Sequence, residues 1–408
     1  MPSYLTAALP GTGGILRAES ADFLVEEIPL YAACGEGDHL YLTVEKCGIT
    51  TFDLIRQVAR ALHCSEREIG YAGLKDARAV TRQTVSVPQR RPADVAGLVL
   101  PGIRILAAHC HRNKLRLGHL AGNRFRIRIH QPGADALPRA EAILAVLQQH
   151  GVPNRFGDQR YGITGNSHRI GRAILHDDFT AAGQEIVGDP AVIRHPAWQS
   201  AALAFRAGDL DGALSRLPRH CLPERRLLEA LRAGQPPRAA VLALPRRLLR
   251  LYLSAYQSSL FDRLLDMRLH ALTQLWPGDI ACKHVNGACF SVLDPAAEQP
   301  RAEAFEISPT APLFGCKVPL AGGQAGLLER RLLEEERLTL EAFRRPGGLT
   351  MDGERRPLRV PLTEVTAAND GTDLLLAFRL PKGSFATAVL HEVLKNSAAP
   401  PELVDVAD

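Results

Sequence analysis

A glycine-rich segment at residues 70–76, GYAGLKD, contains the residue types best suited to chemistry. Two glycines permit a tight backbone path, and a lysine and an aspartate follow the second glycine closely. An aspartate held ionised by nearby cations can act as a nucleophile or a base, whereas most loop aspartates form Asx-turns or helix caps. The spacing matches neither the GxxxxGK[ST] nor the GxGxxG phosphate-binding motif. The residue types alone leave the role of Asp76 open.

The eight cysteines give little support for a metal site. None belongs to a CxxC pair, and the nearest approach to a ligand pattern is Cys282 and His284 with Cys289. The pair Asn286-Gly287 between them predicts a hairpin turn. Buried or incidental thiols are the favoured interpretation, so the sequence predicts no metal site.

Apolar and basic residues alternate around position 125. Phe125, Ile127 and Ile129 alternate with arginines at 124, 126 and 128, which predicts a strand with one buried and one basic face. Residues 95–134 contain seven Lys or Arg and no acidic residue. Such a face can follow a phosphate backbone or can be a solvated strand surface, and the pattern leaves both open.

The elements that must position these residues follow from periodicity. Alternation predicts strands at 40–44, 84–87 and 374–378, and apolar spacing predicts helices at 50–62 and 138–149. Thr50 is the predicted N-cap of the first helix and Gly151 the stop of the second.

The middle of the chain is different in character. Residues 165–272 are predicted to be mainly helical, and 216–250 contains nine arginines against two glutamates. A charged helix is predicted at 327–343 and a linker at 346–348. Ser384 is the predicted cap of a last helix that runs through Leu394. Strands at both ends around a helical middle predict one α+β domain interrupted by an insertion.

Composition excludes several classes of protein. With 408 residues, 46% hydrophobic and 23% charged, the chain is not disordered. No apolar run reaches the roughly 18 residues of a membrane span, and no secretory signal is visible. Scattered cysteines suit a reducing compartment, so a cytoplasmic protein without membrane contact is expected. The net charge of +5 neither requires nor excludes a nucleic-acid partner.

Seven segments together resemble the TruD family of tRNA pseudouridine synthases. They keep the order of the family's motifs and span nearly the whole chain: GILRAESADFLVEE (14–27), GYAGLKDARAVTRQ (70–83), KLRLGHLAGNRFRI (114–127), GVPNRFGDQRYG (151–162), LSAYQSSLFD (253–262), ERRPLRV (354–360) and LPKGSFATAVLHE (380–392). The resemblance implies a pseudouridine synthase-like catalytic domain with a mixed or antiparallel sheet, formed by residues 1–154 and 348–408. A large, mainly helical TRUD domain would be inserted at 155–347.

The resemblance also implies the site residues. Asp76 matches the catalytic aspartate, and Arg17 falls where the family has a basic residue able to pair with it. The familiar bacterial form has lysine at the position of Arg17, so the side chain departs from the pattern while the charge does not. The resemblance assigns substrate binding to four further positions. Asn123 would contact the substrate, Phe125 would pack on the target base, and Phe23 and Phe385 would line the uridine pocket.

The implied activity is the isomerisation of uridine to pseudouridine, with uridine 13 in the D-arm of tRNA as the usual target. The base must leave its stack, and Asp76 attacks either C1′ of the ribose or C6 of the uracil. The resemblance implies no metal and no cofactor. The alternative is a non-catalytic RNA-binding or chaperone protein that retains the fold. The arginines of 216–250 either contact RNA or cover solvated helices, and the oligomeric state is left open.

Overall fold

The computed structural model describes residues 3–16 and 19–396. The chain forms two compact units, Met1–Val152 with Val360–Asp408 (the first unit) and Pro153–Arg359 (the second unit). It passes from one to the other at two short strands that pair with each other, β7 (Val152–Pro153) and β12 (Arg359–Val360).

These limits differ from the boundaries at 154 and 348 that the family resemblance implies. The second limit lies later because β11 (Glu354–Pro357) pairs with β10 (Ile307–Leu313) inside the second unit. The assignment of the units as a split catalytic domain and an inserted TRUD domain stays a prediction.

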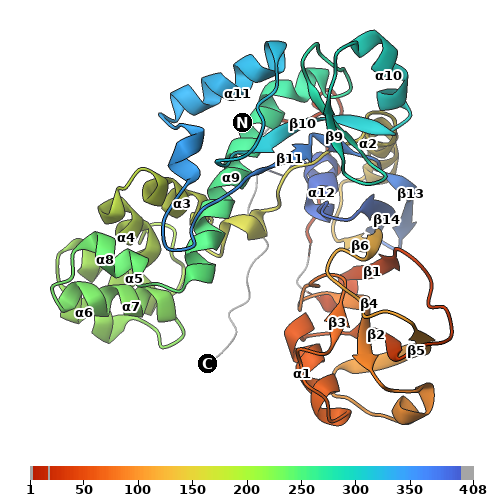
Figure 1. Cartoon of the computed structure of the whole chain (residues 1–408), viewed down its shortest axis with the longest axis horizontal. Helices are drawn as coiled ribbons and strands as arrows, with labels where there is room; N and C mark the ends of the chain where they lie inside the picture. Colours follow the sequence, from red (N-terminus) through yellow and green to blue (C-terminus); the bar gives the residue numbers. More distant parts are fainter. Residues whose placement is uncertain (1–2, 17–18, 397–408) are drawn as a thin grey trace. The chain divides into compact units, whose positions relative to one another are not determined.

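An eight-stranded sheet forms the centre of the first unit, and its strands come from both segments of that unit, one early and one late in the sequence (Figure 1). Its strands are β1 (Phe23–Pro29), β2 (His39–Lys46), β3 (Gly70–Tyr71), β4 (Val80–Pro88), β5 (Ile103–His111), β6 (Leu120–Ile129), β13 (Thr363–Asp370) and β14 (Asp373–Pro381). The order is β13-β14-β6-β1-β4-β2-β5, with β3 paired to β4. β1 and β4 are parallel and the other neighbours antiparallel. The predicted α+β class with a mixed sheet is confirmed.

Strand β6 follows the predicted alternation. Phe125, Ile127 and Ile129 are buried, while Arg124 and Arg126 are exposed. The pairing of β6 with β14 is regular along its length, so no bulge reverses the direction of a side chain. The apolar face of this sheet is therefore the face opposite the arginines.

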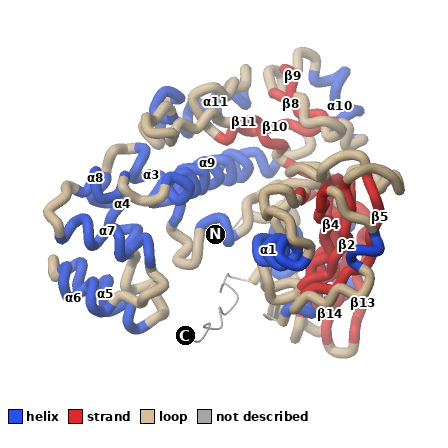
Figure 2. The backbone as a smooth tube through the Cα atoms, turned by 60° about the horizontal axis from the view of Figure 1, so that its bottom comes forward, coloured by secondary structure: helices blue, strands red, loops and turns tan. Residues whose placement is uncertain are grey.

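Helices cover the apolar face in two places. Helix α1 (Thr51–Ala61) packs on β2 and β4 (Figure 2), where Leu54 and Val58 join Leu42 and Val44 in one apolar cluster. Helices α2 (Ala136–His150) and α12 (Ala386–Leu394) form a second cluster with β6 and β14. Short 3-10 turns, η1 (Ser20–Asp22) and η2 (Pro92–Val95), complete this unit.

Three residues are predicted to mark helix ends: Thr50 and Ser384 as caps and Gly151 as a stop. Thr50 and Asp53 form the capping box of α1, and Gly151 ends α2 with a φ of 87°, as predicted. The prediction for Ser384 is wrong. Helix α12 begins after Phe385 without a side-chain cap, and the buried Ser384 hydroxyl has no hydrogen-bond partner among residues 3–16 and 19–396.

The second unit is mainly helical, as the sequence predicts for residues 165–272. Its helices are η3 (Asp158–Tyr161), α3 (Ser167–Leu175), α4 (Phe179–Val187), α5 (Pro196–Arg206), α6 (Leu210–Arg216), α7 (Leu222–Arg232), α8 (Pro237–Leu242), α9 (Arg246–Arg268), η4 (Leu269–Ala271), α10 (Pro295–Glu303), α11 (Gly323–Glu335) and η5 (Leu340–Phe343). The long helix α9 runs beside α3 (Figure 2).

A four-stranded sheet, β11-β10-β8-β9, completes the second unit. β8 (Ile280–Lys283) and β9 (Cys289–Ser291) form the hairpin predicted around Asn286-Gly287. The single charged helix predicted at 327–343 is wrong in one respect, because Arg337 adopts a φ of 52° and separates α11 from η5.

Candidate active site

Polar side chains interrupt the apolar face of the large sheet where its two apolar clusters meet. Strand pairing places Glu27 opposite Asn123 and Lys46 opposite Thr81, on the face that also carries Phe125. Residues that pair across strands share a face. We name this group the polar strip; its members are Glu27, Lys46, Thr51, Lys75, Thr81, Gln83 and Asn123.

Lys75 anchors the loop that precedes β4 to the polar strip. Its Nζ lies 3.0 Å from Glu27 Oε1 and donates to Asn123 Oδ1 at 3.0 Å. The side chains of Lys75 and Glu27 are only 7% and 3% exposed, so water screens this ion pair weakly. The backbone N–H of Lys75 donates to Thr51 Oγ1 at 2.9 Å. The loop is thus held at both the side chain and the backbone of one residue.

Asp76 lies outside this anchor. Its side chain is exposed, while that of its neighbour Lys75 is buried. The backbone N–H of Arg78 donates to Asp76 Oδ1 at 3.0 Å, which is an Asx-turn. The turn interpretation of Asp76 is therefore correct for the local structure. It also gives the carboxylate a defined direction, which a nucleophile or a base requires.

The buried side chain of Lys46 supports the same loop from the interior of the first unit. It is 1% exposed, and its Nζ donates to the carbonyl oxygens of Ile49 at 2.7 Å and Asp76 at 2.9 Å. Burial lowers the pKa of Lys46, and the nearby negative charge of Asp76 opposes that shift. A buried ammonium group therefore lies directly behind the loop that carries Asp76.

The candidate aromatic residues fall into two groups. Phe23, half-buried at the start of β1, meets Phe125 edge to face with ring centroids 6.2 Å apart. Phe125 is 6% exposed and packs on Phe378 at 5.5 Å, so it points away from the arginines. Phe385 is 38% exposed at the start of α12. Arg17 lies outside the described residues.

Carboxylates from distant parts of the chain neutralise two of the three arginines on the opposite face. Arg124 pairs with Glu364 at 2.6 Å and with Glu26 at 3.4 Å. Arg128 pairs with Asp370 and Asp373. Residues 95–134 lack acids in sequence, but the fold supplies them from β1 and the β13–β14 hairpin. This weakens the interpretation of the row as a phosphate-binding stripe.

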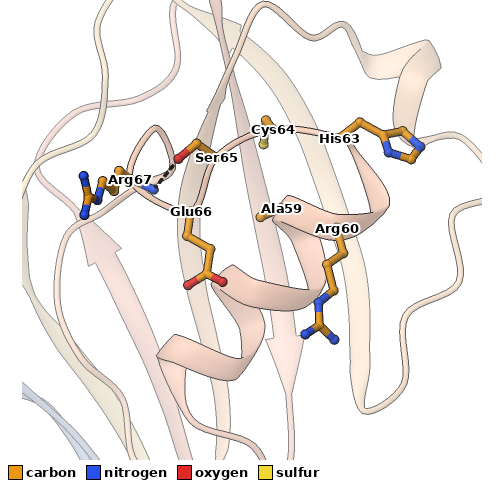
Figure 3. A pocket seen from close by; sticks show the side chains of 7 residues that line it. All are labelled: Ala59, Arg60, His63, Cys64, Ser65, Glu66 and Arg67. Carbon is orange, nitrogen blue, oxygen red and sulfur yellow. Dashed lines mark hydrogen bonds between the residues drawn. The ribbon is translucent and has the colours of Figure 1, made fainter.

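A surface hollow lies elsewhere on the first unit, at the end of α1 (Figure 3). It is open to solvent, and none of the candidate residues lines it. Its lining residues are Ala59, Arg60, His63, Cys64, Ser65, Glu66 and Arg67. The polar strip and this hollow therefore do not coincide.

The remaining predictions concern metal and membrane. Among residues 3–16 and 19–396, no three His, Cys, Asp or Glu side chains form a group that could hold a metal ion. No helix in that part of the chain combines the length and apolar character of a membrane span. The expectation of no metal and no cofactor stays a prediction.

Sequence reasoning missed Glu27 and Lys46, and it noted Lys75 in the GYAGLKD segment without assigning it a role. One signal was present, because Leu40, Leu42 and Val44 alternate as buried residues and Lys46 takes the next position on the same face. A lysine at an apolar position of a strand pattern is buried only when it has partners. Glu27 follows Val25 in the same way along β1.

Comparison with known proteins places this chain in a class. A family model described as tRNA pseudouridine synthase D (TruD) matches residues 1–393. A tRNA pseudouridine synthase D of Geobacter metallireducens is 57% identical over 394 residues, which are 96% of this chain and 98% of that protein. One of Syntrophotalea carbinolica is 58% identical and covers 97% of this chain and 100% of its own length.

A solved structure agrees with these relatives. The crystal structure of a Methanosarcina mazei protein assigned to tRNA pseudouridine synthase D superposes with a TM-score of 0.82 at 29% identity, over 97% of this chain and 96% of that one. The chain is thus a pseudouridine synthase, an isomerase of RNA. More narrowly, it belongs to the TruD family, and the predicted family is confirmed.

Proposed function

We propose that this protein isomerises uridine 13 in the D-arm of tRNA, with Asp76 as the nucleophile and the target base flipped out of its stack. Membership of the TruD family supports tRNA as the substrate. The observation that carries the assignment of Asp76 is the buried anchor at Lys75, which leaves the adjacent carboxylate exposed and directed.

The reaction exchanges one glycosidic bond for another. The C1′–N1 bond breaks, the C1′–C5 bond forms, C5 releases a proton and N1 finally carries one. Attack of the Asp76 carboxylate on C1′ or on C6 allows the base to detach, and a flipped base is held by aromatic side chains. We assign this holding role to Phe23, Phe125 and Phe385, and a substrate contact to Asn123.

Tritium release tests the activity and the nucleophile together. A tRNA transcript labelled at uracil C5 loses tritium when C5 becomes bonded to C1′. We expect the wild type to release tritium and Asp76→Asn to lose at least about 10³-fold in turnover. Asp135→Asn, which changes an aspartate side chain that is 71% exposed, is the matched control and should retain activity.

Three outcomes separate the alternatives. No release by the wild type from any tRNA would favour the non-catalytic RNA-binding hypothesis. Full turnover by Asp76→Asn would remove Asp76 as nucleophile. Release that persists when position 13 of the transcript is cytidine would show that another uridine is the target.

For Arg17 the proposal rests on the sequence alone. A cation that keeps a carboxylate ionised acts on turnover more than on RNA affinity. We expect Arg17→Ala to lower kcat about 100-fold with little change in the Kd for tRNA, and Arg17→Lys to restore most of it. Equal losses of kcat and affinity would indicate a phosphate contact instead.

We also assign the first unit as the catalytic domain and the second as the inserted TRUD domain. A cytoplasmic location stays a prediction.

A further inference from the structure

The side-chain amide of Asn123 has a fixed polarity. An ammonium group can only donate hydrogen bonds, so the atom of Asn123 that faces Lys75 Nζ at 3.0 Å must be the amide oxygen. The amide NH₂ consequently points away from Lys75. No hydrogen bond joins this NH₂ to any of the residues that the structure describes.

Glu27 holds Lys75 in the position that sets this polarity. Glu27 Oε1 lies 3.0 Å from Lys75 Nζ, and its Oε2 accepts from the backbone N–H of Thr84 at 3.0 Å. Glu27 and Asn123 are also direct cross-strand partners on β1 and β6. The chain of contacts from Thr84 through Glu27 and Lys75 to Asn123 is thus tied to the sheet at both ends.

The charges of Glu27 and Lys75 favour a single orientation of the Asn123 amide. Both charged side chains are more than nine-tenths buried, so separation of the pair would leave an uncompensated charge out of water. Rotation of the Asn123 amide by 180° would place two donors against each other. The amide therefore presents a donor, and only a donor, to a ligand.

We infer that Glu27 and Lys75 are positioning residues, which fix Asn123 so that its NH₂ group donates to a carbonyl oxygen of the target base. This inference rests on the proposed function. Uracil carries carbonyl oxygens at positions 2 and 4 and no amino group, so a fixed donor is complementary to it. If the bound oxygen is O4, the same donor also rejects cytosine, which carries an amino group at position 4, whereas a donor to O2 does not distinguish the two bases.

Thio-substituted substrates test the contact, because sulfur accepts hydrogen bonds weakly. Transcripts carry uridine, 2-thiouridine or 4-thiouridine at the target position, and nucleoside chromatography measures the kcat/KM for each. We expect the wild type to lose about tenfold on one of the two thio substrates, and the position of that loss identifies the oxygen. Asn123→Ala should lower turnover of uridine and lose this sensitivity to sulfur.

The variant Glu27→Gln with Lys75→Met tests the positioning residues. It removes both buried charges together, and the amide oxygen of the introduced glutamine still accepts from the backbone N–H of Thr84. With the Asn123 amide able to rotate, the thio penalty should fall to about twofold or less. A purely structural role would lower kcat/KM for all three substrates by the same factor and leave the penalty unchanged.

Asn123→Asp gives a second measurement if the double variant does not fold. A carboxylate keeps a partner for Lys75 but presents an acceptor in place of the NH₂ donor. It should therefore fold and lose at least about tenfold in kcat/KM for uridine. Equal thio penalties in the wild type and Asn123→Ala, or full activity of Asn123→Asp, would overturn the inference. Absence of turnover by the wild type would instead contradict the proposed function.

Discussion

Lys46 shows how one buried side chain supports a loop. Its ammonium group donates to the backbone oxygens of Ile49 and Asp76 and has almost no contact with water. Lys46→Met keeps the length of the side chain but removes both bonds. Misplacement of a reacting group by about 1 Å can cost roughly 100-fold in rate. We expect at least a tenfold loss of kcat with an unchanged Kd for tRNA.

Tritium release and filter binding measure these two quantities for Lys46→Met. Lys317→Met, which changes a lysine that is 65% exposed and paired with Asp352, is the control and should match the wild type. Loss of tRNA affinity in proportion to kcat would show that Lys46 acts on folding or on RNA binding.

At the scale of elements, Glu336 joins three helices of the second unit. It follows α11 and accepts from Tyr256 on α9 at 2.6 Å and from Arg172 on α3 at 2.8 Å, with a further ion pair to Arg263. Burial alone would raise the pKa of Glu336, but the hydrogen bonds from Tyr256, Arg172 and Arg263 outweigh it and lower the pKa to about 2.

This shift predicts a pH-dependent stability. A carboxyl group whose pKa falls on folding stabilises the native state above its unfolded pKa, near 4.5, and loses that contribution as the pH falls toward 2. After allowance for partial screening by solvent, we expect Glu336→Gln to cost roughly 2 kcal/mol at pH 7. The difference from the wild type should decrease steadily between pH 5 and pH 2.

Tryptophan fluorescence during urea unfolding measures this effect. Both tryptophans of the chain, Trp198 and Trp276, belong to the second unit, so the signal reports on the unit that contains Glu336. Glu334→Gln, which changes an exposed neighbour, should alter the free energy of unfolding by less than about 0.5 kcal/mol. A Glu336→Gln effect that is constant with pH would contradict the assigned cause.

At the scale of the whole molecule, charge is distributed unevenly. The net charge is +5, but seven of the nine arginines at 216–250 divide into two groups, while Arg225 and Arg250 donate to backbone carbonyl oxygens. Arg216, Arg232 and Arg238 form ion pairs with Asp209, Asp211 and Asp177. The second group consists of four exposed arginines of this stretch whose side chains make no ion pair or hydrogen bond to any residue that the structure describes: Arg219, Arg226, Arg246 and Arg247. Uncompensated cations of this kind are suited to phosphate contacts.

A salt titration tests whether this second group contacts tRNA. Replacement of Arg219, Arg226, Arg246 and Arg247 by Gln should reduce the slope of log K against log salt by about 0.7–0.9 for each lost phosphate contact. Turnover at saturating tRNA should be unchanged. The control replaces Arg216, Arg232 and Arg238 by Gln. An unchanged slope in the first variant would mean that the stretch only covers solvated helices.

The sequence by itself determined what depends on neighbours along the chain. The alternation of β6, the capping box at Thr50 and the stop at Gly151 are local patterns of period and backbone geometry, and all three are confirmed. The family was also accessible, because its motifs are contiguous segments. Ser384 and residues 327–343 show the limit. Among the described residues the Ser384 hydroxyl has no hydrogen-bond partner, and α11 ends at a left-handed residue, Arg337, where the sequence has no glycine to mark the stop.

Tertiary structure decided the surroundings of the site. Arg124 is neutralised by Glu364, 240 residues later, so a stretch without acids is not a free basic surface. Lys75 finds its partners Glu27 and Asn123 on strands 48 residues away on either side. Such contacts depend on which strands pair and in which register, and pairing between distant segments is set by the packing of the whole sheet rather than by the residues next to each strand.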